Sequence, residues 1–170
     1  MFFSNAVYLD EEFHFHAGGF SVENGRFASF STNRGGEDCN GCYVFPGLID
    51  IHLHGNSGVE FSNCEEKALH VASRYLAVHG ITSFALTTLT MPPESIRKTC
   101  QTAKAFYDNG SPFSALRGIT LEGPFLSSKK KGAQDERFLR MPDSQLLKDF
   151  DNASGHLIKI VCIAPELAGA

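Results

Sequence analysis

Two histidines at strand spacing are the residues in this chain best suited to chemistry. His52 and His54 lie in the run Asp50-Ile51-His52-Leu53-His54-Gly55. Residues two apart in a β-strand point to the same side, so both imidazoles are expected at one end of one strand. Two converging imidazoles form half of a transition-metal site. The same spacing, taken alone, is equally consistent with two packed histidines.

A glutamate ends another apolar run. Glu122 follows Leu116–Leu121 and precedes Gly123-Pro124. An unpaired carboxylate at the end of a buried strand is costly. A metal shared with His52 and His54 would supply its partner; the alternative is an ion pair with a lysine of the next loop. The pattern therefore predicts a metal site of His52, His54 and Glu122, with Asp50 placed to orient an imidazole.

The loop Lys129–Gln134 is a third candidate region. Gly132 allows a ligand to approach the backbone, and Gln134 offers both a donor and an acceptor. A lysine run is more often a solvated loop. After a metal-site loop, however, it could lie over a polar or phosphorylated substrate.

Other histidines and cysteines are interpreted as incidental. Cys39 and Cys42 have metal or redox spacing, but no second pair completes a site. Surface or packing positions are predicted for His14, His16, His70 and His79, and His156 precedes a strand rather than ending it.

Strands alternate with helices from Tyr43 onward. Strands are predicted over 48–54, 81–89, 116–121 and 157–163. Helices are predicted from a capping box at Ser62 and Glu65 to His79, from Pro92-Pro93 to Asn109-Gly110, and from Asp143 to Ala153. Ile96, Cys100, Ala103 and Tyr107 are expected to line the buried face of the second helix. This order favours an α/β fold with a parallel sheet and right-handed crossovers. The strand of His52 is apolar enough to be buried in a barrel.

The first 45 residues are predicted to form a separate small β module. Phe13–His16 alternates as a half-buried strand should, and Asn24-Gly25 is typical of a tight hairpin turn. Residues 1–45 and 46–170 are thus the two expected domains. Four strands make about half of an eight-stranded barrel, which typically needs roughly 250 residues.

Composition and charge argue against several classes of protein. The 170 residues carry a formal charge of −4, which argues against a nucleic-acid binder. No apolar run is long enough for a membrane span, and the first residues lack the basic and apolar regions of a secretory signal. Five cysteines with scattered spacing indicate reduced thiols. A cytoplasmic protein without membrane or nucleic-acid partners is expected.

Several motifs together resemble a known family. They are Pro46–Gly55, Asn56–Phe61, Gly80–Phe84, Leu121–Phe125, Lys130–Gln134 and Ala164–Glu166. From about Tyr43 to its end the chain is similar to the N-terminal portion of the N-acetylglucosamine-6-phosphate deacetylases, in the amidohydrolase superfamily. The resemblance implies a (β/α)8 barrel, about half of it present, with a small β-sandwich module built from both chain ends.

The resemblance also implies an activity and a site. The reaction is metal-dependent hydrolysis of the N-acetyl group of N-acetylglucosamine 6-phosphate, giving glucosamine 6-phosphate and acetate. By position, Glu122 matches the central metal ligand, and His52 and His54 match a pair that holds a second ion in some members. One or two divalent ions, zinc or iron, are implied. Ala133 and Gln134 match substrate contacts.

The remaining parts of the family site have no counterpart in these residues. The general-base Asp and two further metal-binding histidines are expected beyond residue 170, so the chain itself contains no catalytic residue. A homodimer is implied for the full-length family. Members often carry His where this chain has Gln134, and Pro where it has Leu86.

Two alternatives stay open. Dihydroorotase-like or deaminase-like amidohydrolases often place a carboxylated Lys or a His on the fourth strand, but Lys159 lies near the start of that strand. A truncated, non-catalytic remnant or partner-dependent ligand-binding fragment is the other. Half a barrel exposes two sheet edges, so these residues alone are expected to need a partner or to dissolve poorly.

Overall fold

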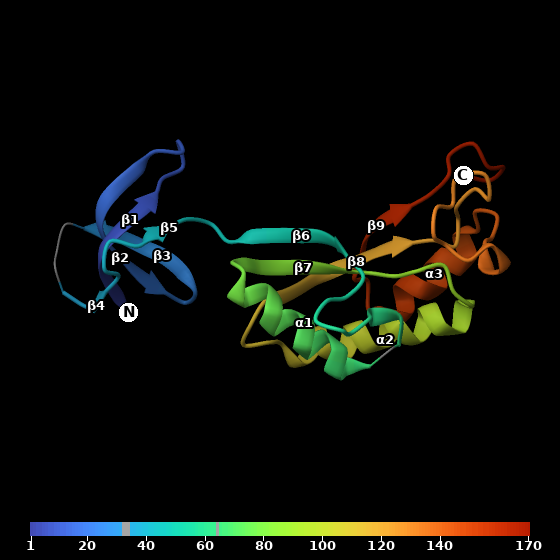
Figure 1. Ribbon diagram of the computed structural model, residues 1–170, viewed down its shortest axis with the longest axis horizontal. Helices are drawn as coiled ribbons and strands as arrows, with labels where there is room; N and C mark the ends of the chain where they lie inside the picture. The colour runs from blue at the N-terminus through green and yellow to red at the C-terminus, as the bar shows by residue number, and fades with distance from the viewer. Residues whose placement is uncertain (32–34, 64) are drawn as a thin grey trace. The chain divides into compact units, whose positions relative to one another are not determined.

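The chain forms two compact units. The computed structural model describes residues 1–31, 35–63 and 65–170. The first unit is Met1–Pro46 and the second is Gly47–Ala170 (Figure 1).

The first unit is a small sheet centred on its first strand. Strand β1 (Phe2–Leu9) pairs antiparallel with β2 (Phe15–Glu23) and parallel with β4 (Glu37–Asp38) and β5 (Tyr43–Val44), and β2 pairs with β3 (Arg26–Ser31). The predicted hairpin turn is present: Asn24 and Gly25 have φ of 51° and 74° between paired Glu23 and Arg26. That this unit contributes to a β-sandwich stays a prediction.

The strand predicted over Phe13–His16 is confirmed only for Phe15 and His16, which begin β2. Phe13 has φ of 63° and lies in a turn, strand β2 begins only at Phe15, and all four residues are exposed. Asp10 holds this turn, because its Oδ1 accepts hydrogen bonds from the backbone N–H groups of Glu12 and His14, at 2.9 and 2.8 Å. An Asx-type turn competes with a strand at such positions.

The second unit is a parallel sheet with crossover helices, as predicted. Its order is β6-β7-β8-β9, and every neighbouring pair is parallel. The strands are β6 (Leu48–Leu53), β7 (Ile81–Thr87), β8 (Ala115–Glu122) and β9 (Ile158–Cys162). The helices are α1 (Glu66–Val78), α2 (Pro93–Asn109) and α3 (Ser144–Ala153), with 3₁₀ turns η1 (Phe61–Asn63) and η2 (Glu136–Phe138).

The core lies between the sheet and the helices on one of its faces (Figure 1). Phe84 of β7 and Ile119 of β8 are fully buried there. Helix α2 buries Ile96, Cys100, Ala103 and Phe106, a spacing of four, three and three residues. The prediction of Tyr107 on this face is wrong, since Tyr107 is 47% exposed and Phe106 takes the place.

Helix α1 has its N-cap three residues after the predicted one at Ser62. Ser62 lies in η1, and the N-cap is Glu65, whose side chain makes no capping hydrogen bond. The other predicted helix ends are close to those observed. Pro93 opens α2, and Gly110, with φ of 70°, caps its C-terminus.

Strand β6 is an exposed edge strand here, which corrects the expectation of a buried one. Leu48, Ile49 and Ile51 are 58%, 67% and 59% exposed. The reason is topological: among the described strands, β6 pairs with β7 and with no other. Its apolar sequence is therefore not matched by burial within these 170 residues.

Helix α3 offers a test of the predicted N-terminus at Asp143. The Asp143 carboxylate accepts hydrogen bonds from the backbone N–H groups of Gln145 and Leu146, at 2.8 and 3.0 Å. Replacing Asp143 with Ala is expected to lower the free energy of unfolding by about 1 kcal/mol, the usual value of an N-cap. Urea denaturation followed by circular dichroism measures it. Gln145→Ala, an exposed change on the same helix, should leave the midpoint nearly unchanged.

Candidate metal centre

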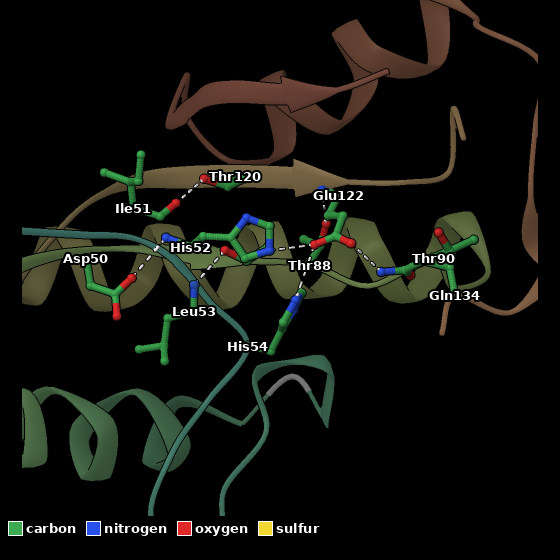
Figure 2. A network of polar contacts seen from close by, with 11 residues as sticks. Asp50, Ile51, His52, Leu53, His54, Thr88, Thr90, Thr120, Glu122 and Gln134 are labelled. Atoms are coloured by element: carbon green, nitrogen blue, oxygen red, sulfur yellow. Dashed lines mark hydrogen bonds and ion pairs between the residues drawn. The ribbon is translucent and has the colours of Figure 1, made fainter. Parts of the chain in front are cut away.

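Strands β6 and β8 bring three ligand atoms together at the end of the sheet where both strands terminate. Both strands run the same way, so their C-terminal ends meet there. The Glu122 Oε2 atom lies 2.7 Å from His52 Nε2 and 3.2 Å from His54 Nε2. Figure 2 shows both rings directed at the carboxylate. The residues predicted as metal ligands thus converge, although they are about 70 positions apart in the chain.

The donor set fits a divalent ion. Glu122 Oε2 and His54 Nδ1 are buried without a hydrogen-bond partner among the described residues. The short approach of Nε2 to Oε2 is therefore not a regular hydrogen bond. Ligand atoms held at 2.0–2.1 Å around a tetrahedral zinc would lie about 3.3 Å apart. The separation of His54 Nε2 from Glu122 Oε2, 3.2 Å, is close to this value, and that of His52 Nε2, 2.7 Å, is shorter. Two imidazoles and a carboxylate suit zinc and iron alike.

The alternative of a lysine partner for Glu122 is not observed. Lys131 Nζ donates to the backbone oxygen of Gln134, at 3.0 Å. Lys129 and Lys130 are exposed. The partners of the carboxylate are the two histidines and Gln134.

Buried threonines fix the strand ends that carry these ligands. Leu53 N–H donates to Thr87 Oγ1 at 2.9 Å, where β6 leaves its regular ladder. Glu122 N–H donates to Thr88 Oγ1 at 3.1 Å. Thr120 Oγ1 donates to the backbone oxygen of Ile51 at 2.7 Å. Thr88 and Thr120 were not predicted as site residues; the sequence signal was only a cluster of threonines at strand ends.

Asp50 does not take the predicted role. Its Oδ1 accepts a hydrogen bond from the backbone N–H of His52, at 3.0 Å, and no imidazole of the described residues bonds to it. The carboxylate caps the strand's own backbone because the two groups are only two residues apart.

The two residues predicted to contact substrate differ in exposure. Ala133 is exposed, whereas Gln134 is only 7% exposed. Gln134 Oε1 accepts from Thr90 N–H and its Nε2 donates to Glu122 Oε1, each at 2.7 Å. The second N–H of the amide has no acceptor among the described residues.

Gly123 is the position where a side chain would most disturb this site. Its φ is 77°, and a Cβ there would lie 2.0 Å from Thr90 Oγ1. Gly123→Ala is expected to weaken zinc binding and to destabilise the chain, because either Thr90 or the Glu122 backbone must move. Gly132→Ala is a matched control: φ is 60°, but nothing lies within 4 Å of the added Cβ. It should show only the strain of a left-handed residue, about 1–2 kcal/mol. Equal effects in chelator competition would contradict this account.

Several other titratable groups lie outside this site. His70 and His79 are exposed, as expected. The backbone N–H of Cys42 donates to the backbone oxygen of Cys39 at 2.9 Å and closes a turn, and burial raises the pKa of Cys39. Cys162 pairs in register with Glu122, and burial followed by the carboxylate's charge raises the pKa of its thiol.

A second group of possible ligands lies in the first unit. Asp10, Glu12 and His14 have ligand atoms within 4.8 Å of one another. Glu12 and His14 are exposed, and Asp10 already bonds His16 at 2.6 Å as well as the backbone. These bonds account for the cluster without an ion.

The chain has relatives among known proteins, although it matches no family model. The chain is 35% identical over 155 residues to N-acetylglucosamine-6-phosphate deacetylase of Bacillus subtilis strain 168, covering 85% of this chain and 39% of that protein. The Homo sapiens deacetylase is 37% identical over 136 residues, covering 76% and 33%. The sequence is homologous to the N-terminal part of the N-acetylglucosamine-6-phosphate deacetylases.

Solved deacetylase structures extend the homology to the whole chain. The Mycobacterium smegmatis enzyme superposes with a TM-score of 0.86 at 25% identity, over 100% of this chain and 49% of that one. The Thermotoga maritima enzyme gives 0.80 at 26%, over 99% and 44%. A mutant of the M. smegmatis enzyme, in complex with N-acetyl-D-glucosamine-6-phosphate, gives 0.87.

The homology covers part of a longer enzyme. The chain spans about a third of the length of the curated deacetylases it matches, 33–39%. These homologues are named as deacetylases, a kind of hydrolase. Among the described helices, none has both the length and the apolar character that crossing a membrane requires.

Proposed function

We propose that this chain supplies the front part of a metal-dependent enzyme that hydrolyses the N-acetyl group of N-acetylglucosamine 6-phosphate to glucosamine 6-phosphate and acetate. One observation supports this most: His52, His54 and Glu122 converge where the strands of the sheet end, the place at which such barrels carry out chemistry, and Glu122 Oε2 has no hydrogen-bond partner among the described residues. The homology to deacetylases supplies the substrate class.

The chain's residues have distinct tasks in this proposal. Glu122 and the two histidines hold one or two divalent ions, zinc or iron. Such an ion, when bound, lowers the pKa of a coordinated water and polarises the amide carbonyl. Glu122 also contributes negative charge that balances the ion. Hydrolysis adds the water oxygen to the acetyl carbon, breaks the C–N bond and leaves the proton on the amine.

Ala133 and Gln134 are proposed to contact the sugar. Ala133 is exposed beside the site, and Gln134 retains one N–H that its protein contacts do not use. The M. smegmatis complex with N-acetyl-D-glucosamine-6-phosphate supports a sugar phosphate as the ligand class.

The rest of the site and of the barrel is proposed to come from residues outside this sequence. Further strands of a (β/α)8 barrel would cover the exposed Ile49 and Ile51 of β6, and would carry the general-base Asp and two more histidines. Strands from outside this sequence would likewise cover the exposed aromatic residues of the first unit, completing its β-sandwich. A homodimer is proposed for the complete protein. A cytoplasmic location agrees with the free thiols among the described cysteines.

Acetate release tests this function. The complete protein that contains these residues, loaded with zinc or iron, is expected to release one acetate per N-acetylglucosamine 6-phosphate. The unphosphorylated sugar is the matched control for recognition of the phosphate. These 170 residues alone are expected to bind metal without turnover. A complete, metal-loaded protein that releases no acetate would refute the proposed reaction.

The reading as a carboxylated-lysine amidohydrolase finds no support. Lys159 is the second residue of β9, and its Nζ donates to the backbone oxygen of His156, which precedes the strand, at 2.9 Å. It belongs to the end of the sheet opposite Glu122.

A further inference from the structure

Gln134 lies in direct contact with the proposed metal ligand Glu122. Its side-chain amide sits between two groups that come from different strand ends (Figure 2). Nε2 donates to Glu122 Oε1, and Oε1 accepts from the backbone N–H of Thr90, both at 2.7 Å. The residue is only 7% exposed, so water competes little for either bond.

The backbone of Thr90 fixes the orientation of this amide. A backbone N–H can only donate, so the amide must turn its oxygen toward Thr90. The NH2 group then necessarily faces Glu122. The bond from Thr90 therefore fixes Gln134 as the hydrogen-bond donor to the Glu122 carboxylate.

This contact gives the two oxygens of the Glu122 carboxylate different neighbours. Oε1 is occupied by the amide, whereas Oε2 faces His52 and His54 and has no hydrogen-bond partner. The carboxylate is thus held with one oxygen directed at the position where the two imidazoles meet. Hydrogen bonds of this kind orient metal ligands and are typically worth 10- to 100-fold in metal affinity.

The backbone of Gln134 is also bonded twice to Lys131. Gln134 N–H donates to the backbone oxygen of Lys131 at 3.2 Å, and Lys131 Nζ returns to the backbone oxygen of Gln134 at 3.0 Å. The loop that carries Lys129–Lys131 is thereby tied to the carboxylate of Glu122.

We propose that Gln134 is a positioning residue: it orients Glu122 so that only Oε2 is presented to the ion, and it couples the Lys129–Gln134 loop to the metal centre. This role rests on the proposed metal site and deepens it. It also explains why a residue in a substrate-facing loop is almost completely buried.

Gln134→Glu is the sharpest test, because it keeps the side chain's shape and its bond from Thr90 N–H. It replaces only the donor that faces Glu122 with a second acceptor. Zinc affinity of the full chain, measured by competition with a chromophoric chelator, is expected to fall about 10- to 100-fold. The zinc affinity of Gln134→Leu should fall by a similar factor. Gln134→His should recover most of the affinity, since imidazole can accept from Thr90 and donate to Glu122.

Gln145→Glu is the matched control. Gln145 is exposed at the start of α3, so it makes the same change of charge far from any ligand. Circular dichroism and the urea midpoint confirm that each variant is folded. If Gln134→Glu binds zinc as tightly as Gln145→Glu does, or if His rescues no better than Leu, the proposed positioning role is overturned while the metal site stands.

A second measurement does not depend on metal. In the metal-free chain, Gln134→Ala, Glu122→Ala and the double variant form a cycle of urea midpoints. A non-additive shift is expected, because either single change already breaks the contact. Strictly additive shifts would overturn the contact. A wild-type chain that binds no zinc but shows coupling would instead count against the metal proposal alone.

Discussion

Replacing Glu122 with Gln is expected to remove metal from the chain. The carboxylate supplies the only negative charge among the three converging ligands, and its Oε2 is the atom that both imidazoles face. Zinc sites with four ligands bind with roughly 10–16 kcal/mol, so one ligand is worth about 3 kcal/mol, or roughly 100-fold in affinity. Equilibrium dialysis with elemental analysis gives the stoichiometry, and chelator competition gives the affinity.

The fold should survive this substitution. A glutamine at position 122 still offers an oxygen to Gln134 Nε2, and its backbone N–H still reaches Thr88 Oγ1. Glu136→Gln is the matched control, because Glu136 is exposed in the same loop region. Zinc retained at wild-type stoichiometry in Glu122→Gln, with Glu136→Gln unchanged, would contradict the assignment of Glu122 as a ligand.

Replacing Phe84 with Ala is expected to cause the largest loss of stability. Phe84 is fully buried on β7, next to the strand that carries both histidines. Its ring lies 6.2 Å from that of Phe61 and 6.5 Å from that of Phe106, between sheet and helices. Truncating a buried phenylalanine costs about 3–5 kcal/mol, from lost transfer energy and from the cavity left behind. Urea denaturation followed by circular dichroism measures the change.

Phe113→Ala is the control for this measurement. Phe113 is 46% exposed in the loop before β8, so its truncation leaves no enclosed cavity. Its midpoint should shift far less than that of Phe84→Ala. If both variants shift equally, the core described between the sheet and α1 and α2 is not the part of the molecule that limits unfolding.

Local patterns in the sequence were sufficient for most of the second unit. The strand and helix positions follow from apolar runs, helical spacing and the prolines and glycines between them, all of which act over a few residues. Pro93 and Gly110 bound α2 for this reason, and Asp143 caps α3. The predicted N-cap at Ser62 is wrong, because that residue lies in a 3₁₀ turn and the helix has its N-cap at Glu65.

The first unit was less predictable. Strand β1 is its centre, yet its sequence carries little alternation, and its pairing is with segments up to 36 residues away. Phe13–His16 shows the pattern of a strand, but only Phe15 and His16 lie in β2, because Asp10 bonds the backbone before them and makes a turn. Sheet partners depend on contacts that no local pattern encodes.

The sequence by itself determined which residues could hold a metal: two histidines at strand spacing and a glutamate at the end of another strand. It determined this because side-chain direction in a strand follows from a period of two. Only the tertiary structure decided that Glu122 presents Oε2 to the histidines while Gln134 occupies Oε1. That arrangement depends on the backbone N–H of Thr90, a donor that every residue except proline carries and that only folding places within 2.7 Å of the amide.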